Sequence, residues 1–228
     1  MIFKKVDIIE CLHTMAYRFQ EIFRMIIPGL YLLSIITCSY LFSEHTKLSH
    51  GDWVELQNII KNFSTLIVLL IPFVGFVVGY FIECMMSILE HLFYFLGGRR
   101  PSKTVLSGSS IYVVHNLNSI VDKLGVKDSL TNKKCKEALQ KAKQQIDRTN
   151  CLDFLYLSVL ARNIFGSQLI ITIFLLFQFG WNSKAVFFAL PFNIIFLIYW
   201  FHKNHVYVKY VFAEYGKMCI SDNSGQTQ

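Results

Sequence analysis

Charged residues and helix breakers are both scarce in this sequence. Charged side chains make up 16% of the 228 residues, against roughly 25% in ordinary soluble domains, and only 4 Pro and 12 Gly occur. These shortages exclude a collagen-like chain, and a hydrophobic content of 54% excludes a disordered one. Apolar residues are abundant instead, with 21 Phe, 11 Tyr and a mean hydropathy of +0.43.

Motifs that carry chemistry are missing as well. The chain contains no H-E-x-x-H, G-x-S-x-G, P-loop or G-x-G-x-x-G motif. His202 and His205 lie three residues apart with no acidic residue close in sequence. The six cysteines form no C-x-x-C pair, so we expect neither a metal site nor a disulfide framework. The sequence predicts a protein that is not an enzyme and that uses no cofactor.

Four apolar blocks have the length that a membrane span requires. About 20 residues of helix, each rising ~1.5 Å, cross a hydrocarbon layer of ~30 Å. The blocks contain no charged residue and cover residues 25–42, 62–82, 163–183 and 185–201. We therefore predict an all-α, polytopic membrane protein with four transmembrane helices and a central cytoplasmic helical section.

The blocks divide the chain into five regions. The second helix is expected to continue beyond its block to Leu96, where Gly97-Gly98 ends it. Apolar periodicity in the central section predicts helices over 113–124 and 131–148, and the polar residues 221–228 are expected to be disordered. The regions are a cytoplasmic amphipathic helix (1–24), a first transmembrane pair (25–96), a cytoplasmic helical section (97–162), a second transmembrane hairpin (163–201) and a cytoplasmic tail (202–228).

The basic residues predict the orientation of the chain. Of the 22 Lys and Arg, 19 lie on the side of the two termini and the central section, and only Lys47, Lys61 and Lys184 lie in the other loops. Basic loops stay in the cytoplasm, so we expect an inner-membrane protein with both termini inside. Arg24, just before the first block, is expected to extend toward the lipid headgroups. Topology thus explains the basic isoelectric point better than nucleic-acid binding does.

Four polar residues at the end of the second helix form a candidate site. Ser87, Glu90 and His91 follow Glu83 at offsets of four, seven and eight, and therefore share one helix face. Charged groups inside a membrane are unfavourable unless they face water or a partner. These residues are either the acidic inner mouth of an oligomeric pore, or groups outside the bilayer that pair with Lys or Arg of the central section.

The apolar blocks also hold small and polar residues with two possible roles. Gly75-x-x-x-Gly79 permits close helix approach, either between subunits or within one subunit. Polar side chains in the blocks line a water path or, as is more common, form hydrogen bonds between helices. These polar residues are Ser34, Thr37, Gln168, Thr172, Gln178 and Asn193.

One predicted helix of the central section is basic. Lys133, Lys134, Lys141 and Arg148 lie on the side opposite its apolar residues. This surface suits RNA, a protein partner or anionic lipid. The helix lacks interleaved aromatic residues, which disfavours direct nucleic-acid binding, so lipid headgroups or solvent are the favoured neighbours.

Four short motifs, together with the topology, carry a resemblance to a known group of proteins. They are Ile27-Pro28-Gly29-Leu30, Val78-Gly79-Tyr80, Arg162-Asn163-Ile164-Phe165-Gly166-Ser167 and Tyr210-Val211-Phe212-Ala213-Glu214-Tyr215. The chain resembles small four-span membrane proteins of bacterial antiviral systems, such as the membrane components of Kiwa or of type VI CRISPR loci. The resemblance implies a membrane-acting defence component that forms an oligomer and responds to a cytoplasmic partner. No arginine has a histidine at the Arg-x4–6-His spacing of HEPN ribonucleases, so the ribonuclease-like proteins of such loci are a poorer match.

Two functions remain open on these grounds. The leading hypothesis is a homo-oligomeric inner-membrane effector or sensor whose assembly perturbs or permeabilises the bilayer, with the first two spanning helices at the oligomer core. The alternative is a non-conducting membrane scaffold that anchors a cytoplasmic effector protein through the basic helix. A solute transporter would require a broken-helix pair with convergent charges, which the sequence lacks.

Overall fold

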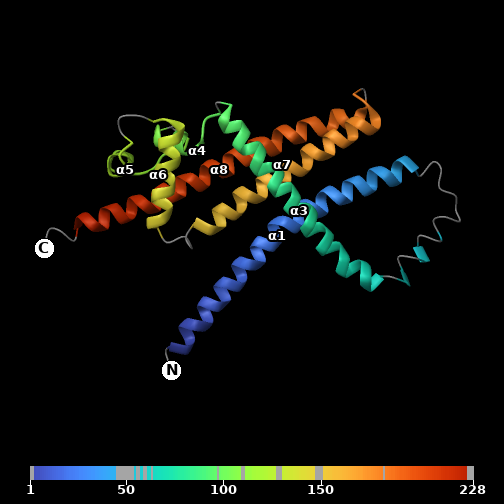
Figure 1. The fold of residues 1–228 in the computed structure, drawn as a ribbon, viewed down its shortest axis with the longest axis horizontal. Helices are drawn as coiled ribbons and strands as arrows, with labels where there is room; N and C mark the ends of the chain where they lie inside the picture. Colours follow the sequence, from blue (N-terminus) through green and yellow to red (C-terminus); the bar gives the residue numbers. More distant parts are fainter. Residues whose placement is uncertain are drawn as a thin grey trace. The chain divides into compact units, whose positions relative to one another are not determined.

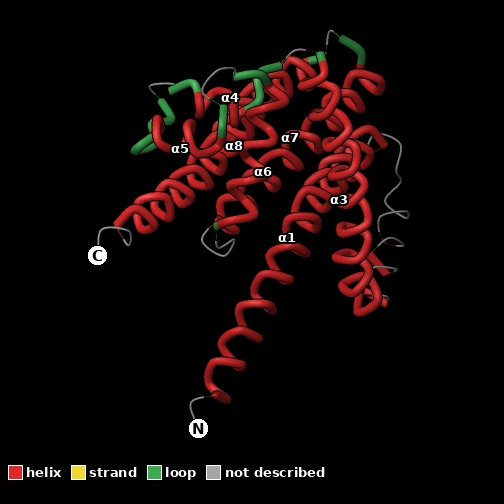
Figure 2. Tube along the Cα trace, turned by 60° about the vertical axis from the view of Figure 1, so that its left-hand side comes forward, coloured by secondary structure: helices red, strands yellow, loops and turns green. Residues whose placement is uncertain are grey.

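The computed structural model describes residues 3–44, 54, 57–58, 61–62, 64–96, 98–108, 111–126, 130–146, 151–181 and 183–224. These residues form helices and loops without a strand, which confirms the predicted all-α class (Figures 1 and 2). The helices are α1 (Phe3–Glu44), α3 (Ser64–Phe95), α4 (Pro101–Leu106), α5 (Leu117–Leu124), α6 (Asn132–Gln145), α7 (Leu152–Phe179) and α8 (Lys184–Ser224).

Four of these helices are long and apolar enough to cross a membrane, as the sequence predicts. The apolar stretches lie in α1, α3, α7 and α8, and many of their large side chains are exposed on the protein surface. Phe73, Phe81 and Phe188, for example, are each more than 60% exposed. Lipid is the natural neighbour of such a surface, so the chain is a multi-pass membrane protein. The candidate spans are Phe19–Ser39, Leu70–Phe95, Leu152–Phe179 and Lys184–Cys219.

Two helices continue further than the apolar blocks predicted. α1 is a single helix of 42 residues, so the expected segment 1–24 is continuous with the first block, and Pro28 lies inside the helix. α8 runs for 41 residues to Ser224, so the expectation of disorder from residue 221 is wrong as far as Ser224. Residues 225–228 lie outside the described residues. No proline or glycine separates either extension from its block, so helix propagation continues along each chain segment.

The central helices differ from the prediction at their ends. α5 begins at Leu117 rather than at Val113, because Asn116 has a φ of 58°, which a right-handed helix cannot contain. α6 begins after Thr131, whose hydroxyl accepts a hydrogen bond from the amide of Lys134 at 3.3 Å. The helix ends at Gln145, and the backbone of the next residue, Ile146, is extended.

The chain divides into two compact units. Unit 1 comprises Met1–Ser87 and Arg162–Phe196, and unit 2 comprises Ile88–Ala161 and Leu197–Gln228. Unit 1 therefore contains α1, together with segments of α3, α7 and α8. Unit 2 contains the remaining segments of those three helices, and it also contains α4, α5 and α6.

Unit 2 has a hydrophobic core of its own. α4 and α5 both pack against α6. The buried face of α6 is the predicted apolar arc, and its Cys135 and Ala142 are completely inaccessible to solvent. They belong to one cluster with Val105 of α4, Ile120 of α5 and Phe212 of α8. The segment of α8 after Leu197 is thus part of a folded unit, and not a tail.

Candidate functional site

An ion cluster in unit 1 joins three of the four long helices. The Glu83 carboxylate on α3 accepts from the Arg24 guanidinium on α1 at 3.5 Å, and the same carboxylate oxygen lies 3.7 Å from the Arg162 guanidinium on α7. Glu21, one turn before Arg24, lies 3.8 Å from that arginine and is more exposed. The Arg24 side chain therefore points toward α3. It does not extend toward the lipid headgroups, contrary to the prediction from the sequence.

This cluster is shielded from solvent. The side chains of Arg24, Glu83 and Arg162 are 15%, 19% and 13% exposed. Isolated charges are strongly unfavourable in such surroundings, and mutual pairing offsets part of the desolvation penalty. Two guanidinium groups share one carboxylate, so the cluster is stabilised by Glu83 more than by either arginine alone.

Hydrogen bonds between membrane helices continue from this cluster through unit 1. The Ser167 hydroxyl on α7 lies 3.0 Å from the carbonyl oxygens of both Pro28 on α1 and Asn163 in its own helix. The Tyr31 hydroxyl on α1 donates to the Gln168 side-chain oxygen at 2.6 Å. The Gln168 side-chain nitrogen donates in turn to the Ala189 carbonyl on α8 at 3.4 Å. These bonds connect α1, α7 and α8 through polar side chains.

A second polar contact joins α7 to α8. The Asn193 side-chain nitrogen donates to the Thr172 hydroxyl at 2.6 Å. Thr172 itself donates to the Gln168 carbonyl, one turn earlier in α7, at 2.9 Å. Of the polar residues that the sequence singled out, Gln168, Thr172 and Asn193 thus bond within one chain, while Ser34 donates to the backbone of its own helix. Thr37 is exposed.

Asn163 stands out because it is completely buried. Within the described part of the chain, neither its side-chain oxygen nor its side-chain nitrogen has a hydrogen-bond partner. The side-chain oxygen of Gln178 on α7 is likewise buried and without such a partner. Neither feature is predictable from sequence, because an amide in an apolar segment looks the same whether or not it has a hydrogen-bond partner.

Gly75 and Gly79 pack within one chain, against α1. A Cβ added at Gly79 would overlap the Met25 carbonyl oxygen, and one added at Gly29 would overlap the Gly75 carbonyl oxygen. A Cβ added at Gly75 would meet side-chain atoms of Leu30 at 2.8 Å. Close backbone contact between α1 and α3 therefore requires glycine at positions 29 and 79.

The four residues expected at a pore mouth fall in different surroundings. Glu83 is held in the ion cluster, and Ser87 is half-buried in the same unit. In unit 2, the Glu90 carboxylate accepts from the Asn204 side chain on α8 at 3.5 Å, while His91 is exposed. Glu83 pairs with Arg162 and with Arg24, so its carboxylate has basic partners within the chain.

The basic residues of α6 lie on its exposed side. Lys133, Lys134 and Lys141 are exposed, whereas Arg148 lies outside the described residues. Burial raises the pKa of the Cys135 thiol on the opposite side of α6, and Lys103 acts in the other direction. One side of the helix is therefore exposed and cationic, and the opposite side is buried in the core of unit 2.

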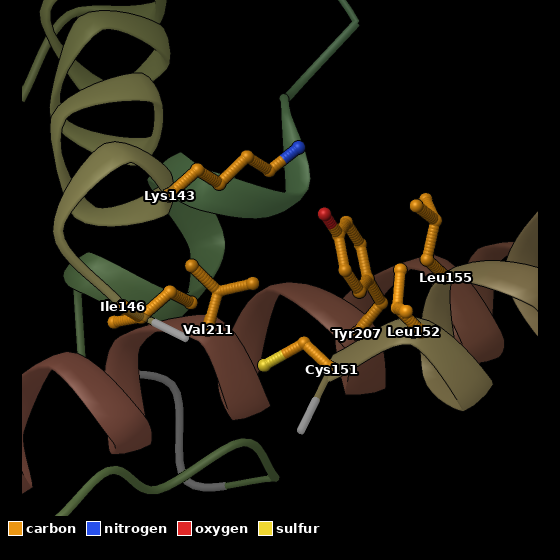
Figure 3. A pocket seen from close by; sticks show the side chains of 7 residues that line it. All are labelled: Lys143, Ile146, Cys151, Leu152, Leu155, Tyr207 and Val211. Carbon is orange, nitrogen blue, oxygen red and sulfur yellow. The ribbon is translucent and has the colours of Figure 1, made fainter. Parts of the chain in front are cut away.

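A small, mainly apolar cavity lies in unit 2 among α6, α7 and α8, with a volume of about 250 Å³ (Figure 3). The Lys143 ammonium, at its edge, lies 4.8 Å from the centre of the Tyr207 ring. A cation beside an aromatic ring makes a cation–π contact. The cavity is lined by Lys143, Ile146, Cys151, Leu152, Leu155, Tyr207 and Val211.

The two neighbouring histidines of α8 pack against one aromatic residue. The Tyr112 hydroxyl lies 3.2 Å from His202 Nδ1, and its ring stacks on His205 with the ring centres 4.8 Å apart. Burial raises the pKa of the Tyr112 hydroxyl. Among the described residues, no group of three His, Cys, Asp or Glu side chains is placed to hold a metal ion.

No protein-family model, curated protein or solved structure matches this chain.

Proposed function

We propose that this protein is a non-conducting membrane anchor whose unit 2 binds a cytoplasmic effector protein. The proposal rests on one observation. Glu83, Gln168, Thr172 and Asn193, four of the charged and polar residues that were candidates to line a path through the bilayer, bond to groups of the same chain. A conducting path needs polar groups that face water, and these groups face neighbouring helices instead.

The glycine packing supports the same conclusion. Gly29 and Gly79 form the close contact between α1 and α3 inside one chain. They are therefore occupied, and are not free to form the core of an oligomer in this arrangement. The close contact that these glycines permit is therefore made within a single chain.

The charge distribution supports a place for unit 2 on the cytoplasmic side of a bacterial inner membrane. Nineteen of the 22 Lys and Arg lie on the side of the termini and the central section, which is the expected cytoplasmic side. Lys134 and Lys141 of α6 share one exposed helix flank there and suit an acidic protein surface. On the resemblance to membrane components of antiviral systems, the partner would be the effector of such a system.

Site-specific photo-cross-linking tests this function. A photoreactive amino acid at Lys141 in the full chain, in living cells, should cross-link one cytoplasmic protein. Lys134→Glu should abolish the adduct, because it reverses the charge on the same flank. Lys184→Glu, a charge reversal near the α7–α8 turn, is the matched control and should leave the adduct unchanged. An adduct that survives Lys134→Glu, or the absence of any protein adduct, contradicts the proposal.

One observation favours the permeabilising oligomer as a second candidate. A groove of about 540 Å³ on the surface of α1 and α3 presents the polar side chains of Ser34, Thr37 and Cys38 among apolar ones. A second copy of the chain seated there would cover these polar groups, which lipid cannot hydrogen-bond. A variant that retains Cys38 alone of the six cysteines should then form a disulfide-linked dimer on oxidation in the membrane. A purely monomeric product rules out this contact.

A further inference from the structure

An open groove of about 720 Å³ lies in unit 2, where the last turns of α3 meet the start of α6. One side of the groove is apolar, because Ile88, Leu92 and Phe95 of α3 are 68%, 50% and 85% exposed. Cations occupy the other side, and none of the described residues that line the groove is acidic. The lining consists of Ile88, His91, Leu92, Tyr94, Phe95, Arg100, Asn132, Lys133 and Lys136.

Specific contacts hold the cationic side in place. The Asn132 side chain at the start of α6 donates to the Gly98 carbonyl at 3.0 Å and accepts from the Arg100 amide at 3.4 Å. The Arg100 guanidinium lies 4.8 Å from the centre of the Tyr94 ring. These contacts connect α6 to the segment that follows α3, so Arg100 and the two lysines of α6 converge from separate parts of the chain.

This combination of groups matches one class of ligand. The candidate span of α3 ends at Phe95, so the apolar side of the groove lies along the last turns of this span. A phospholipid at this depth has acyl chains beside the apolar side and a phosphate beside the cations. An acidic protein or a nucleic acid would satisfy the cations but leave Ile88 and Phe95 uncovered.

We propose that this groove is a binding site for an anionic phospholipid. Arg100, Lys133 and Lys136 recognise the charged headgroup, and Ile88, Leu92 and Phe95 pack against the upper part of the acyl chains. The charge complementarity favours an anionic lipid over a zwitterionic one, because a choline or ethanolamine group would bring a positive charge to a cationic site.

The lipid site is separate from the flank proposed for the protein partner. Lys133 and Lys136 are three residues apart and share one flank of α6, whereas Lys134 and Lys141 are seven residues apart and share another. Of these four lysines, Lys133 and Lys136 line the groove, and Lys134 and Lys141 are not among its lining residues. The chain thus offers a matched control, since two exposed lysines can be neutralised on the same helix inside or outside the site.

Native mass spectrometry of the purified full chain in detergent tests this proposal. The protein is titrated with dioleoyl-phosphatidylglycerol and, separately, with dioleoyl-phosphatidylcholine, and affinity for the first bound lipid is measured. Wild type should prefer phosphatidylglycerol. In Lys133→Gln/Lys136→Gln the affinity for phosphatidylglycerol should fall about 30-fold, on the basis of the usual contribution of one basic residue at a membrane surface. In Lys134→Gln/Lys141→Gln it should change less than about threefold.

Each alternative has a distinct outcome. An equal loss in both double variants would mean diffuse surface charge and overturns the site. Displacement of phosphatidylglycerol by millimolar inorganic phosphate would identify a soluble phosphate as the ligand and overturns the lipid assignment, as does tighter binding of an acidic peptide or an RNA oligonucleotide. Leu92→Gln, which changes only the apolar side, should weaken binding of dioleoyl-phosphatidylglycerol but not of inorganic phosphate. Failure of these tests would leave the cross-linking result at Lys141 unaffected.

Discussion

The Glu83 carboxylate on α3 accepts a hydrogen bond at 3.5 Å from the Arg24 guanidinium on α1, although 59 residues separate them in sequence. Both side chains are less than one fifth exposed. Arg162 on α7 lies 3.7 Å from the same carboxylate oxygen, so one acidic group pairs with cations from two other helices. The position of this carboxylate determines how charge is accommodated within the four-helix membrane unit.

Glu83→Gln should destabilise the protein by about 3 kcal/mol, because it removes the buried carboxylate charge that the Arg24 and Arg162 guanidinium groups share. The free energy of unfolding in mixed detergent micelles, followed by circular dichroism, measures the effect. Glu21→Gln is the matched control, since Glu21 also contacts Arg24 but is 40% exposed, and it should change stability by less than about 1 kcal/mol. Equal effects of the two substitutions would contradict the assigned role of Glu83.

Gly79→Ala should destabilise the α1–α3 contact, because the added methyl group would overlap the Met25 backbone, which cannot move aside. We expect a loss of about 2 kcal/mol from such overpacking. Gly75→Ala should be nearly neutral, since the Leu30 side chain can rotate away and alanine is the better helix former by about 1 kcal/mol. Thermal unfolding of the two variants compares them directly. A Gly75→Ala variant as unstable as Gly79→Ala would be inconsistent with this packing.

Asn163→Leu should leave stability unchanged within about 1 kcal/mol or raise it, because a buried amide without a partner among the described residues is replaced by an apolar group of similar size. Gln168→Leu should lower stability by roughly 1 kcal/mol, since it removes the hydrogen bonds to Tyr31 and to Ala189. Unfolding measurements on both variants make the comparison. If Asn163→Leu loses as much as Gln168→Leu, the Asn163 amide has a stabilising partner after all.

Cys135 should make stability fall at alkaline pH. Burial raises the pKa of its thiol in the folded state, so the unfolded state loses this proton at a lower pH than the folded state does. The resulting stabilisation is fully present below the ordinary thiol pKa of about 8.5, and is lost as the pH rises through the folded-state pKa. The free energy of unfolding should therefore decline more steeply in wild type than in Cys135→Ala as the pH rises above about 8.5. Parallel pH profiles would show that Cys135 titrates alike in both states.

The sequence predicted the elements that depend on local pattern. Uninterrupted apolar blocks gave the four spans, and the spacing of Cys135, Ala138 and Ala142 gave the buried arc of α6. The end of α3 near Gly97 followed from the glycine pair. These features depend on periodicity and on helix breakers, both of which are visible in a short window of sequence.

Features that depend on contacts distant in sequence were not predictable in the same way. A basic partner for Glu83 in the central section was one of two predictions from the sequence. Arg24, in contrast, was predicted to extend toward the lipid headgroups. The choice depends on which helix faces pack together, and single-sequence periodicity does not specify that. The left-handed conformation of Asn116 and the continuation of α8 to Ser224 were not predicted, because no pattern in the neighbouring sequence indicates either feature.

Electrical recording from planar bilayers containing the purified full chain tests the central claim most directly, namely that Glu83, Gln168, Thr172 and Asn193 bond within one chain and line no conducting path. The predicted result is a conductance equal to that of the protein-free bilayer, at all voltages and for both wild type and Glu83→Gln. Discrete current steps in wild type whose ion selectivity changes in Glu83→Gln would contradict the claim, and would place this carboxylate in a conducting path.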